Sequence, residues 1–281
     1  MTVALTTICL NEMEWLPKLY EQHKDWPDLL AWIFVEGADK VYQETNPSMV
    51  NSNGLSVDGT SRFLRELEQK DSRVTYVPYG LAYNDHKELG KVALRQKCLE
   101  IVERRNPDYV VILDADEFYV KSDQEQVNAL MASSDADYYC FGWTHIWHPP
   151  SMYDEPLFSR EIQGGFWGMD HMKGFRWQKG MRYTDCHQHP RREDGTHEME
   201  VFGRPRCIHM AFASEATKRY AKHAYYERRG ERTDPARARY CAARSLFSRW
   251  FPGDKVPKGV EILDYTGPVP EAFLNDDLFI S

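Results

Sequence analysis

The chain has 281 residues, of which 42% are hydrophobic and 28% charged, and this composition is typical of a globular protein with a sizeable core. Its six cysteines have no CxxC spacing, which argues against a zinc ribbon and a disulfide framework. No apolar run approaches the ~18–20 residues that span a bilayer, and the start of the chain does not resemble a signal peptide, so we expect a soluble, cytoplasmic protein without a transmembrane segment.

The net charge of −8 is unevenly distributed along the chain. Residues 1–159 carry a net charge of −12, whereas residues 160–258 carry +9. An acidic first half followed by a basic segment indicates that the second half meets an anionic molecule. A basic helix that simply faces solvent is the alternative.

The first part of the chain alternates strand-like and helix-like patterns. In chain order we expect a strand at 3–10, a helix within 11–23, a strand at 29–37, a loop at 38–57, a helix at 59–69, a strand at 73–79, a helix at 86–105 and a strand from Tyr109. Strands separated by helices form βαβ units. The predicted fold class is therefore α/β and Rossmann-like, with a mostly parallel central sheet flanked by helices.

The second part is less regular and more basic. We expect a helix at about 124–133, a strand at 137–147, irregular Gly-, Pro-, Trp- and His-rich sequence at 148–206, and a helix at 214–229. No linker separates the two parts. We therefore predict one domain with two halves, 1–120 and 121–281, of which the second includes an irregular basic acceptor region.

The stretch "YVVILDADEFYV", Tyr109–Val120, carries the most informative motif. Its apolar run is typical of a buried parallel strand, and ligands of open α/β sheets bind beyond the carboxyl ends of such strands. Asp114 and Asp116 flank Ala115 there, and residues i and i+2 of extended backbone share a face. Carboxylate oxygens suit Mg²⁺ or Mn²⁺, which in turn can bridge to phosphate. We predict a metal site formed by these two aspartates.

Four short motifs follow one another along the chain: "TTICLNEMEWL" (6–16), "LSVDGTSRFL" (55–64), "LGKVALRQKCLE" (89–100) and "VVILDADEF" (110–118). Their order resembles that of family 2 of the nucleotide-sugar glycosyltransferases with the A-type fold. The resemblance covers about residues 3–120. It implies that residues 1–120 form the nucleotide-sugar-binding half, and that residues 121–281 bind the acceptor and complete the metal site.

The resemblance also implies where the donor, most simply a UDP-sugar, would bind. The residues implied beside the base and ribose are Thr7, Asn11 and Glu12. Glu36 ends the second strand where the family has an acid, but the Asp-Gly-Thr group comes only at 58–60, so the choice among Glu36, Asp39 and Asp58 stays open.

Two further segments are implied to meet the diphosphate and the metal. Lys91 and Arg95 lie one helical turn apart and can share a face toward phosphate, or form a surface basic pair. The stretch "CIHMAFASEATKRYAKHAYYERRG" (207–230) resembles a late motif of a branch of the family. It implies His209 as a third metal ligand and Lys222 as a diphosphate contact. An imidazole is compatible with Mn²⁺.

The implied reaction is displacement of the nucleoside diphosphate from the sugar C1 by an acceptor hydroxyl, with inversion. A carboxylate must then accept the hydroxyl proton. Where the related branch ends an Arg-rich stretch in His-Glu, this chain has His187 followed by Gln188, so we predict Asp185 as the base and Asp170 as the next candidate.

The acceptor and several alternatives stay open. The basic segment, in which aromatic residues alternate with Arg and Lys, suits either a glycan or a hydroxymethylated base in viral DNA. A metal-dependent nucleotidyltransferase or phosphodiesterase would use similar carboxylates, and a non-catalytic nucleotide-sugar-binding protein would bind without turnover. A zinc site is a further alternative, formed by Cys186, His187, His189 and His197.

Overall fold

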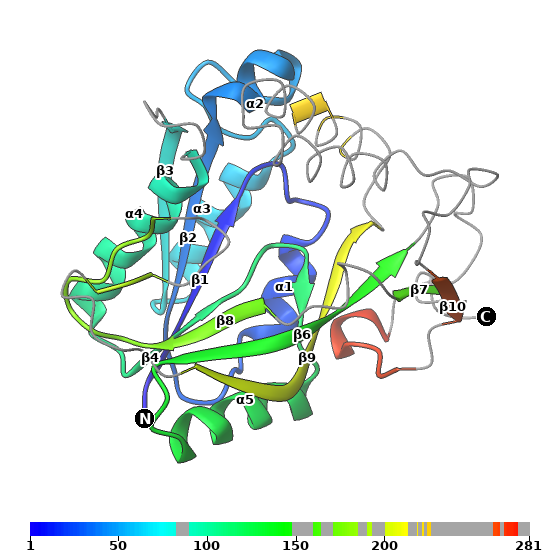
Figure 1. Cartoon of the computed structure of the whole chain (residues 1–281). Coiled ribbons are helices and arrows are strands. Elements are labelled where there is room, and N and C mark those ends of the chain that lie inside the picture. Colours follow the sequence, from blue (N-terminus) through cyan, green and yellow to red (C-terminus); the bar gives the residue numbers. More distant parts are fainter. Residues whose placement is uncertain are drawn as a thin grey trace.

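The structure is a computed structural model, drawn in Figure 1. It describes residues 1–82, 90–147, 160–163, 171–184, 190–192, 200–212, 218, 221, 224–225, 261–264 and 267–274. A ten-stranded mixed sheet forms its centre.

The first half forms the parallel part of the sheet. Its strands are β1 (Val3–Cys9), β2 (Leu29–Asp39), β3 (Val74–Ala82) and β4 (Tyr109–Ile112), and all three of their pairings are parallel. Between them lie α1 (Leu16–His23), α2 (Lys40–Thr45), the short 3₁₀ helix η1 (Pro47–Met49), α3 (Thr60–Lys70) and α4 (Gly90–Arg105). β1, β2 and β4 are apolar and largely buried on both faces, as in parallel sheets covered by helices, whereas the edge strand β3 is partly exposed.

The segment 38–57, expected to be a loop, instead contains the end of β2, α2 and η1. The reason is local, because the side chain of Asp39 accepts a hydrogen bond from the Val41 N–H at 2.7 Å and so caps the start of α2. Pro47 then starts η1, where a proline needs no backbone N–H.

The second half continues the sheet with mostly antiparallel strands. Its elements are β5 (Glu117–Phe118), α5 (Lys121–Ser133), β6 (Tyr138–Trp147), β7 (Arg160–Gln163), β8 (His171–Arg176), β9 (Glu200–Phe212), β10 (Glu261–Asp264) and η3 (Glu271–Phe273). The segment 148–206, expected to be irregular, therefore contains β7, β8 and the start of β9. Of the helix expected at 214–229, the described residues 218, 221, 224 and 225 are helical.

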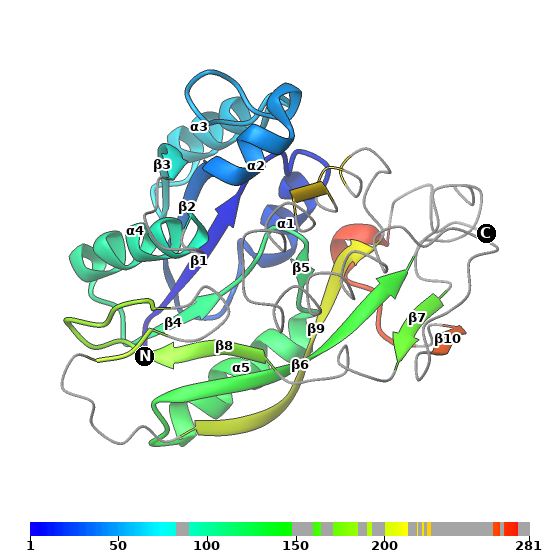
Figure 2. The same cartoon turned by 45° about the horizontal axis from the view of Figure 1, so that its top comes forward.

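Helices cover both faces of the sheet (Figures 1 and 2). The core on one face combines residues of α1, α3 and α5 with η3, whereas the core on the other face is built on α4. The predicted α/β fold class is confirmed. None of the described helices is both long and apolar enough to cross a bilayer.

The strands are ordered β10-β7-β6-β8-β4-β1-β2-β3 across the sheet, with β9 beside β6 and β5 beside β9. The order of the first four strands in the chain creates a switch point in the sheet. From β3 at one edge the chain returns through α4 and adds β4 on the other side of β1. The connections that follow β1 and β4 therefore diverge, and a crevice opens beyond the carboxyl ends of these two strands. Such crevices are where open α/β sheets bind their ligands.

Candidate functional site

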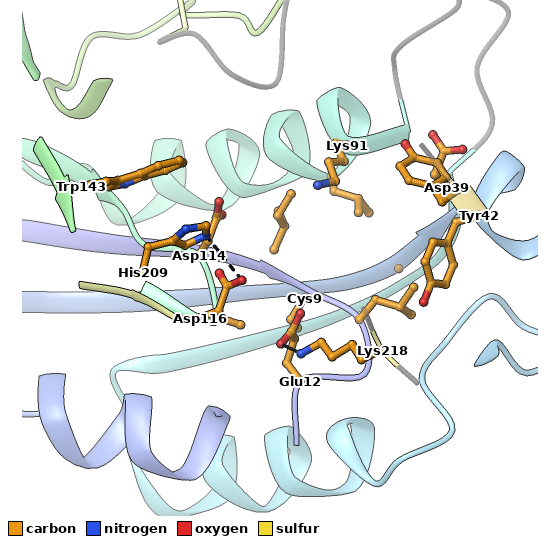
Figure 3. A pocket seen from close by; sticks show the side chains of 16 residues that line it. Cys9, Glu12, Asp39, Tyr42, Lys91, Asp114, Asp116, Trp143, His209 and Lys218 are labelled. Atoms are coloured by element: carbon orange, nitrogen blue, oxygen red, sulfur yellow. Dashed lines mark hydrogen bonds and ion pairs between the residues drawn. The ribbon is translucent and has the colours of Figure 1, made fainter. Parts of the chain in front are cut away.

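A pocket that is partly open to solvent occupies this crevice. Its floor is the end of β1, and its charged lining includes Glu12, Asp39, Lys91, Asp114, Asp116 and Lys218. Figure 3 shows two groups of side chains at opposite ends of the pocket. Trp143, His209 and the two aspartates after β4 lie at one end, Asp39 and Tyr42 lie at the other, and Lys91 and Lys218 lie between them.

Pairing between β5 and β9 brings His209 to Asp116. In this antiparallel pair Glu117 lies opposite His209, and the Met210 N–H donates to the Asp116 carbonyl at 2.8 Å. The His209 Nε2 and the Asp116 Oδ2 are 3.6 Å apart, and both side chains are largely buried. The Trp143 indole stacks on the imidazole with ring centroids 4.5 Å apart, so the imidazole plane is held by packing.

Asp114 faces a buried arginine. The Arg95 Nη2 donates to the Asp114 Oδ1 at 2.5 Å, and Arg95 extends from α4 behind the pocket wall. Burial alone would raise the pKa of Asp114, but the charges of Arg95, Lys173 and Lys91 outweigh burial and hold that pKa well below its usual range. Asp114 is therefore an anion throughout the neutral range, and part of its hydrogen-bonding capacity is used by the protein.

Two of the described helical residues after β9, Lys218 and Tyr225, also line the pocket. The Lys218 ammonium forms an ion pair with the Glu12 carboxylate, across 206 positions of sequence. Burial would lower the pKa of Lys218, but the Glu12 charge more than offsets burial and raises it. The Asn46 Nδ2 donates to the Ala221 carbonyl at 3.0 Å, so the segment after α2 also contacts this helical turn.

Two tyrosines complete this side of the pocket. Tyr42 of α2 and Tyr225 meet edge to face, with ring centroids 5.6 Å apart, and both line the pocket. Burial, with a smaller contribution from the Glu12 charge, raises the pKa of Tyr42 to about 12. The Tyr42 hydroxyl is therefore protonated at neutral pH and can act as a hydrogen-bond donor.

Four of the residues predicted to contact the nucleotide lie outside the pocket. Thr7 is fully buried, and its Oγ1 accepts from the Trp32 Nε1 at 3.0 Å. Asn11 has a left-handed backbone with φ 54°, which asparagine tolerates. Its side chain donates to the Met49 carbonyl at 2.7 Å and accepts from the Val57 N–H at 3.0 Å. Asn11 thus holds the segment that follows η1.

The two acids predicted for the ribose or base are also used within the protein. Glu36 is fully buried, and its carboxylate accepts hydrogen bonds from the Ser56 N–H, the Ser61 hydroxyl and the Tyr76 hydroxyl. Asp58 accepts from the backbone N–H groups of Met13 and Thr60, at 2.9 and 3.0 Å. Among the three acids left open by the sequence, Asp39 is the one that lines the pocket.

The remaining predicted residues either lie at the pocket or fall outside the described part of the chain. Glu12, Lys91, Asp114, Asp116 and His209 line one pocket, and Arg95 contacts it through Asp114. The predicted residues outside the described part of the chain are Asp170, Asp185, Lys222 and the four members of the alternative zinc site. Within the described part, no group of three or more His, Cys, Asp and Glu side chains is arranged to hold a metal ion by itself.

Sequence reasoning missed Tyr42 and Lys218 as pocket residues. The motif that contains Lys218 was found, but Lys222 was chosen from it; two lysines four positions apart share a helix face, so helical spacing does not distinguish them. Tyr42 lay in a segment expected to be a loop. The Asp39 cap on α2 is the signal that would have predicted a helix there.

The chain is similar to known proteins in structure but not detectably in sequence. No protein-family model and no curated protein sequence matches the chain. Among solved structures, residues 1–349 of TarS from S. aureus align with a TM-score of 0.44 and 11% identity, over 89% of this chain and 72% of that one.

Two further solved structures are also similar to the chain, with lower TM-scores. The mannosyltransferase PcManGT from Pyrobaculum calidifontis, solved with GDP-Man and Mn²⁺, has a TM-score of 0.41 and 13% identity, over 87% of this chain and 69% of that one. Glucosyl-3-phosphoglycerate synthase from Mycobacterium tuberculosis, solved with Mn²⁺ and UDP, has a TM-score of 0.33 and 13% identity, over 50% and 44%. At these TM-scores, none of the likenesses assigns a family or an activity to the chain.

Proposed function

We propose that the chain is a metal-dependent glycosyltransferase that moves a sugar from a nucleotide sugar, most simply a UDP-sugar, to an acceptor hydroxyl. The observation that carries this proposal is the composition of the pocket at the switch point. Asp116 and His209 converge at one end, while two lysines lie elsewhere along the wall. A diphosphate needs this combination, because its charge is balanced by cations from the protein and by a bound metal.

The donor set at the first end fits a divalent cation. The Asp116 Oδ2 and His209 Nε2 are 3.6 Å apart, within the span of two ligands whose bonds to one ion are each about 2.0–2.1 Å long. One carboxylate and one imidazole suit Mn²⁺ better than an all-oxygen Mg²⁺ cage. Such an ion would take its other ligands from phosphate oxygens and water, with Asp114 close by. When bound, it stabilises the negative charge that develops on the leaving diphosphate.

The far end of the pocket suits a nucleoside. Asp39 offers a carboxylate to ribose or base donors, and Tyr42 offers a hydroxyl and an aromatic face. Between the two ends, Lys91 and Lys218 lie where the diphosphate would run (Figure 3). Lys218 would then exchange its partner Glu12 for phosphate oxygens. In this arrangement residues 1–120 hold the donor, and residues 121–281 supply His209, Lys218 and the acceptor side.

The reaction requires one more group from the chain. An inverting transfer needs a carboxylate that removes the proton of the acceptor hydroxyl as it attacks the sugar C1. Asp185, or otherwise Asp170, remains our prediction for this base. The acceptor we propose is a glycan or a hydroxymethylated base in DNA, because the segment 160–258 is basic and rich in aromatic residues.

Thermal unfolding with a panel of ligands tests the proposed function. A ligand that binds only the folded chain at 100 times its dissociation constant stabilises it by about 2.7 kcal/mol. We expect a Mn²⁺-dependent rise in melting temperature with one UDP-sugar, absent in Asp116→Asn. Product analysis should then show nucleoside diphosphate.

Three other outcomes would contradict the proposal. A shift with nucleoside triphosphates alone, with release of pyrophosphate, would identify a nucleotidyltransferase. Hydrolysis of a phosphodiester would identify a phosphodiesterase. Tight donor binding without turnover on glycan or hydroxymethylated DNA acceptors would identify a non-catalytic binding protein.

A further inference from the structure

A buried ion pair lies beside the pocket, next to the aspartate loop. The Lys173 Nζ of β8 is 2.5 Å from the Glu117 Oε1 of β5, and the side chains are 4% and 0% exposed. Burial would lower the pKa of Lys173, but the charges of Glu117 and Asp114 outweigh burial and raise it. Because an apolar pair of similar volume is often as stable as a buried ion pair, stability alone does not explain these two charges.

The Glu117 end of the pair holds the loop that carries Asp114 and Asp116. The Glu117 Oε2 accepts a hydrogen bond from the Asp114 N–H at 2.8 Å. In return, the Glu117 N–H donates to the Asp114 carbonyl at 3.1 Å, which closes the turn. Lys173 occupies the other carboxylate oxygen, so its position determines where the Glu117 carboxylate, and with it the turn, is held.

The Lys173 end of the pair contacts the opposite side of the proposed metal site. Its Nζ lies 4.7 Å from the centroid of the Trp143 ring, within the range of a cation–π interaction. The same indole stacks on His209 with an angle of 16° between the ring planes. One ammonium group therefore contacts both the carboxylate that ties the aspartate loop and the ring that holds the imidazole.

We propose that Lys173 is a positioning residue that sets the separation of Asp116 and His209. The inference rests on the proposed function, in which these two side chains hold a divalent cation. Groups that orient metal ligands from behind typically change metal affinity by about 10–100-fold when they are removed. Lys173 differs from most such groups because it contacts the supports of both ligands at once.

A test of this role must separate the charge of Lys173 from its contacts. A positive charge near the pocket opposes the binding of a cation. If Lys173 acted through its charge alone, removal of the charge would strengthen Mn²⁺ binding, whereas loss of a positioning contact weakens it. The double variant Lys173→Met/Glu117→Gln removes one charge of each sign, so the net charge beside the pocket is unchanged.

The experiment compares Mn²⁺ affinity by electron paramagnetic resonance, with saturating uridine diphosphate, in the unaltered chain and in the double variant. We expect the Mn²⁺ dissociation constant to rise about 10–100-fold. Uridine diphosphate affinity without metal should change less than about twofold, because Trp143 lines the pocket and Lys173 does not. The control is Arg73→Met/Asp71→Asn, which removes a more exposed ion pair of 2.7 Å next to the edge strand β3 and should leave Mn²⁺ affinity unchanged.

Lys173→Arg provides a second test that keeps the buried charge and does not depend on the fold of the double variant. The planar guanidinium has a different shape and reach, so we expect weaker Mn²⁺ binding with cooperative unfolding retained. Unchanged or stronger Mn²⁺ binding in either folded variant would overturn the inference and leave the proposed function standing. Failure of the unaltered chain to bind Mn²⁺ with uridine diphosphate would refute the proposed function and this inference together.

Discussion

His23, the last residue of α1, should make the stability of the fold depend on pH. It is fully buried, and the Tyr119 N–H donates to its Nε2 at 3.0 Å. Because that nitrogen must accept, the proton lies on Nδ1, which donates to the Leu19 carbonyl at 2.8 Å. The ring also packs against Trp26 and Trp32. A second proton on the imidazole would put two N–H groups against each other in an apolar site.

The size of the effect follows from the change in pKa. Burial lowers the pKa of His23 from the ordinary 6.5 to about 4. Between these values the unfolded chain binds one more proton than the folded chain, so the free energy of unfolding falls as the pH is lowered. At about 1.4 kcal/mol per pH unit, the stability present above pH 6.5 decreases by about 3 kcal/mol on approaching pH 4.

Urea denaturation between pH 4.5 and pH 7.5, in parallel with His23→Phe, measures this contribution. The variant loses a hydrogen bond at every pH, but it cannot gain the proton, so its stability should vary less with pH. We expect the two curves of unfolding free energy to converge toward low pH with a slope difference of about 1.4 kcal/mol per unit. Parallel curves would refute the assignment of His23 as a buried neutral residue.

Three further predictions concern the pocket and its supports. Gly90→Ala should weaken nucleotide binding about tenfold or more, as measured by calorimetry. The Cβ of the new alanine would collide with the Asp39 carboxylate and displace it from the pocket, where it is proposed to bind the nucleoside. Gly37→Ala should lower the free energy of unfolding by about 1–3 kcal/mol in urea, because its Cβ would collide with the Gly80 carbonyl; a stability equal to that of the unaltered chain would contradict this packing. Glu36→Gln should also cost about 1–3 kcal/mol, because the carboxylate serves three donors, yet nucleotide affinity should stay within about twofold; a large loss of affinity at unchanged stability would instead place Glu36 in the site.

The order of the elements could be predicted from local patterns. The runs at 3–10, 29–37 and 73–79 are apolar and β-branched, and the amphipathic segments between them are helices in the structure. Asp114 and Asp116 follow a buried strand, which was enough to predict that they lie at the ligand edge of a sheet. The segment 148–206 was harder, because β7, β8 and the start of β9 all pair with the distant strand β6, antiparallel for β7 and β8 and parallel for β9, and their sequence lacks clear periodicity.

The sequence by itself determined the α/β class, the position of the aspartate motif after a strand, and the candidacy of His209 through a resemblance. Only the tertiary structure decided which of these side chains meet. His209 lies close to Asp116 because of the register between β5 and β9, and Lys218 meets Glu12 across the chain. The buried Glu36 carboxylate accepts its hydrogen bonds from the protein itself, whereas Asp39 lines the pocket. Contacts between residues distant in sequence depend on sheet register and on competition among buried polar groups, and a local pattern encodes neither.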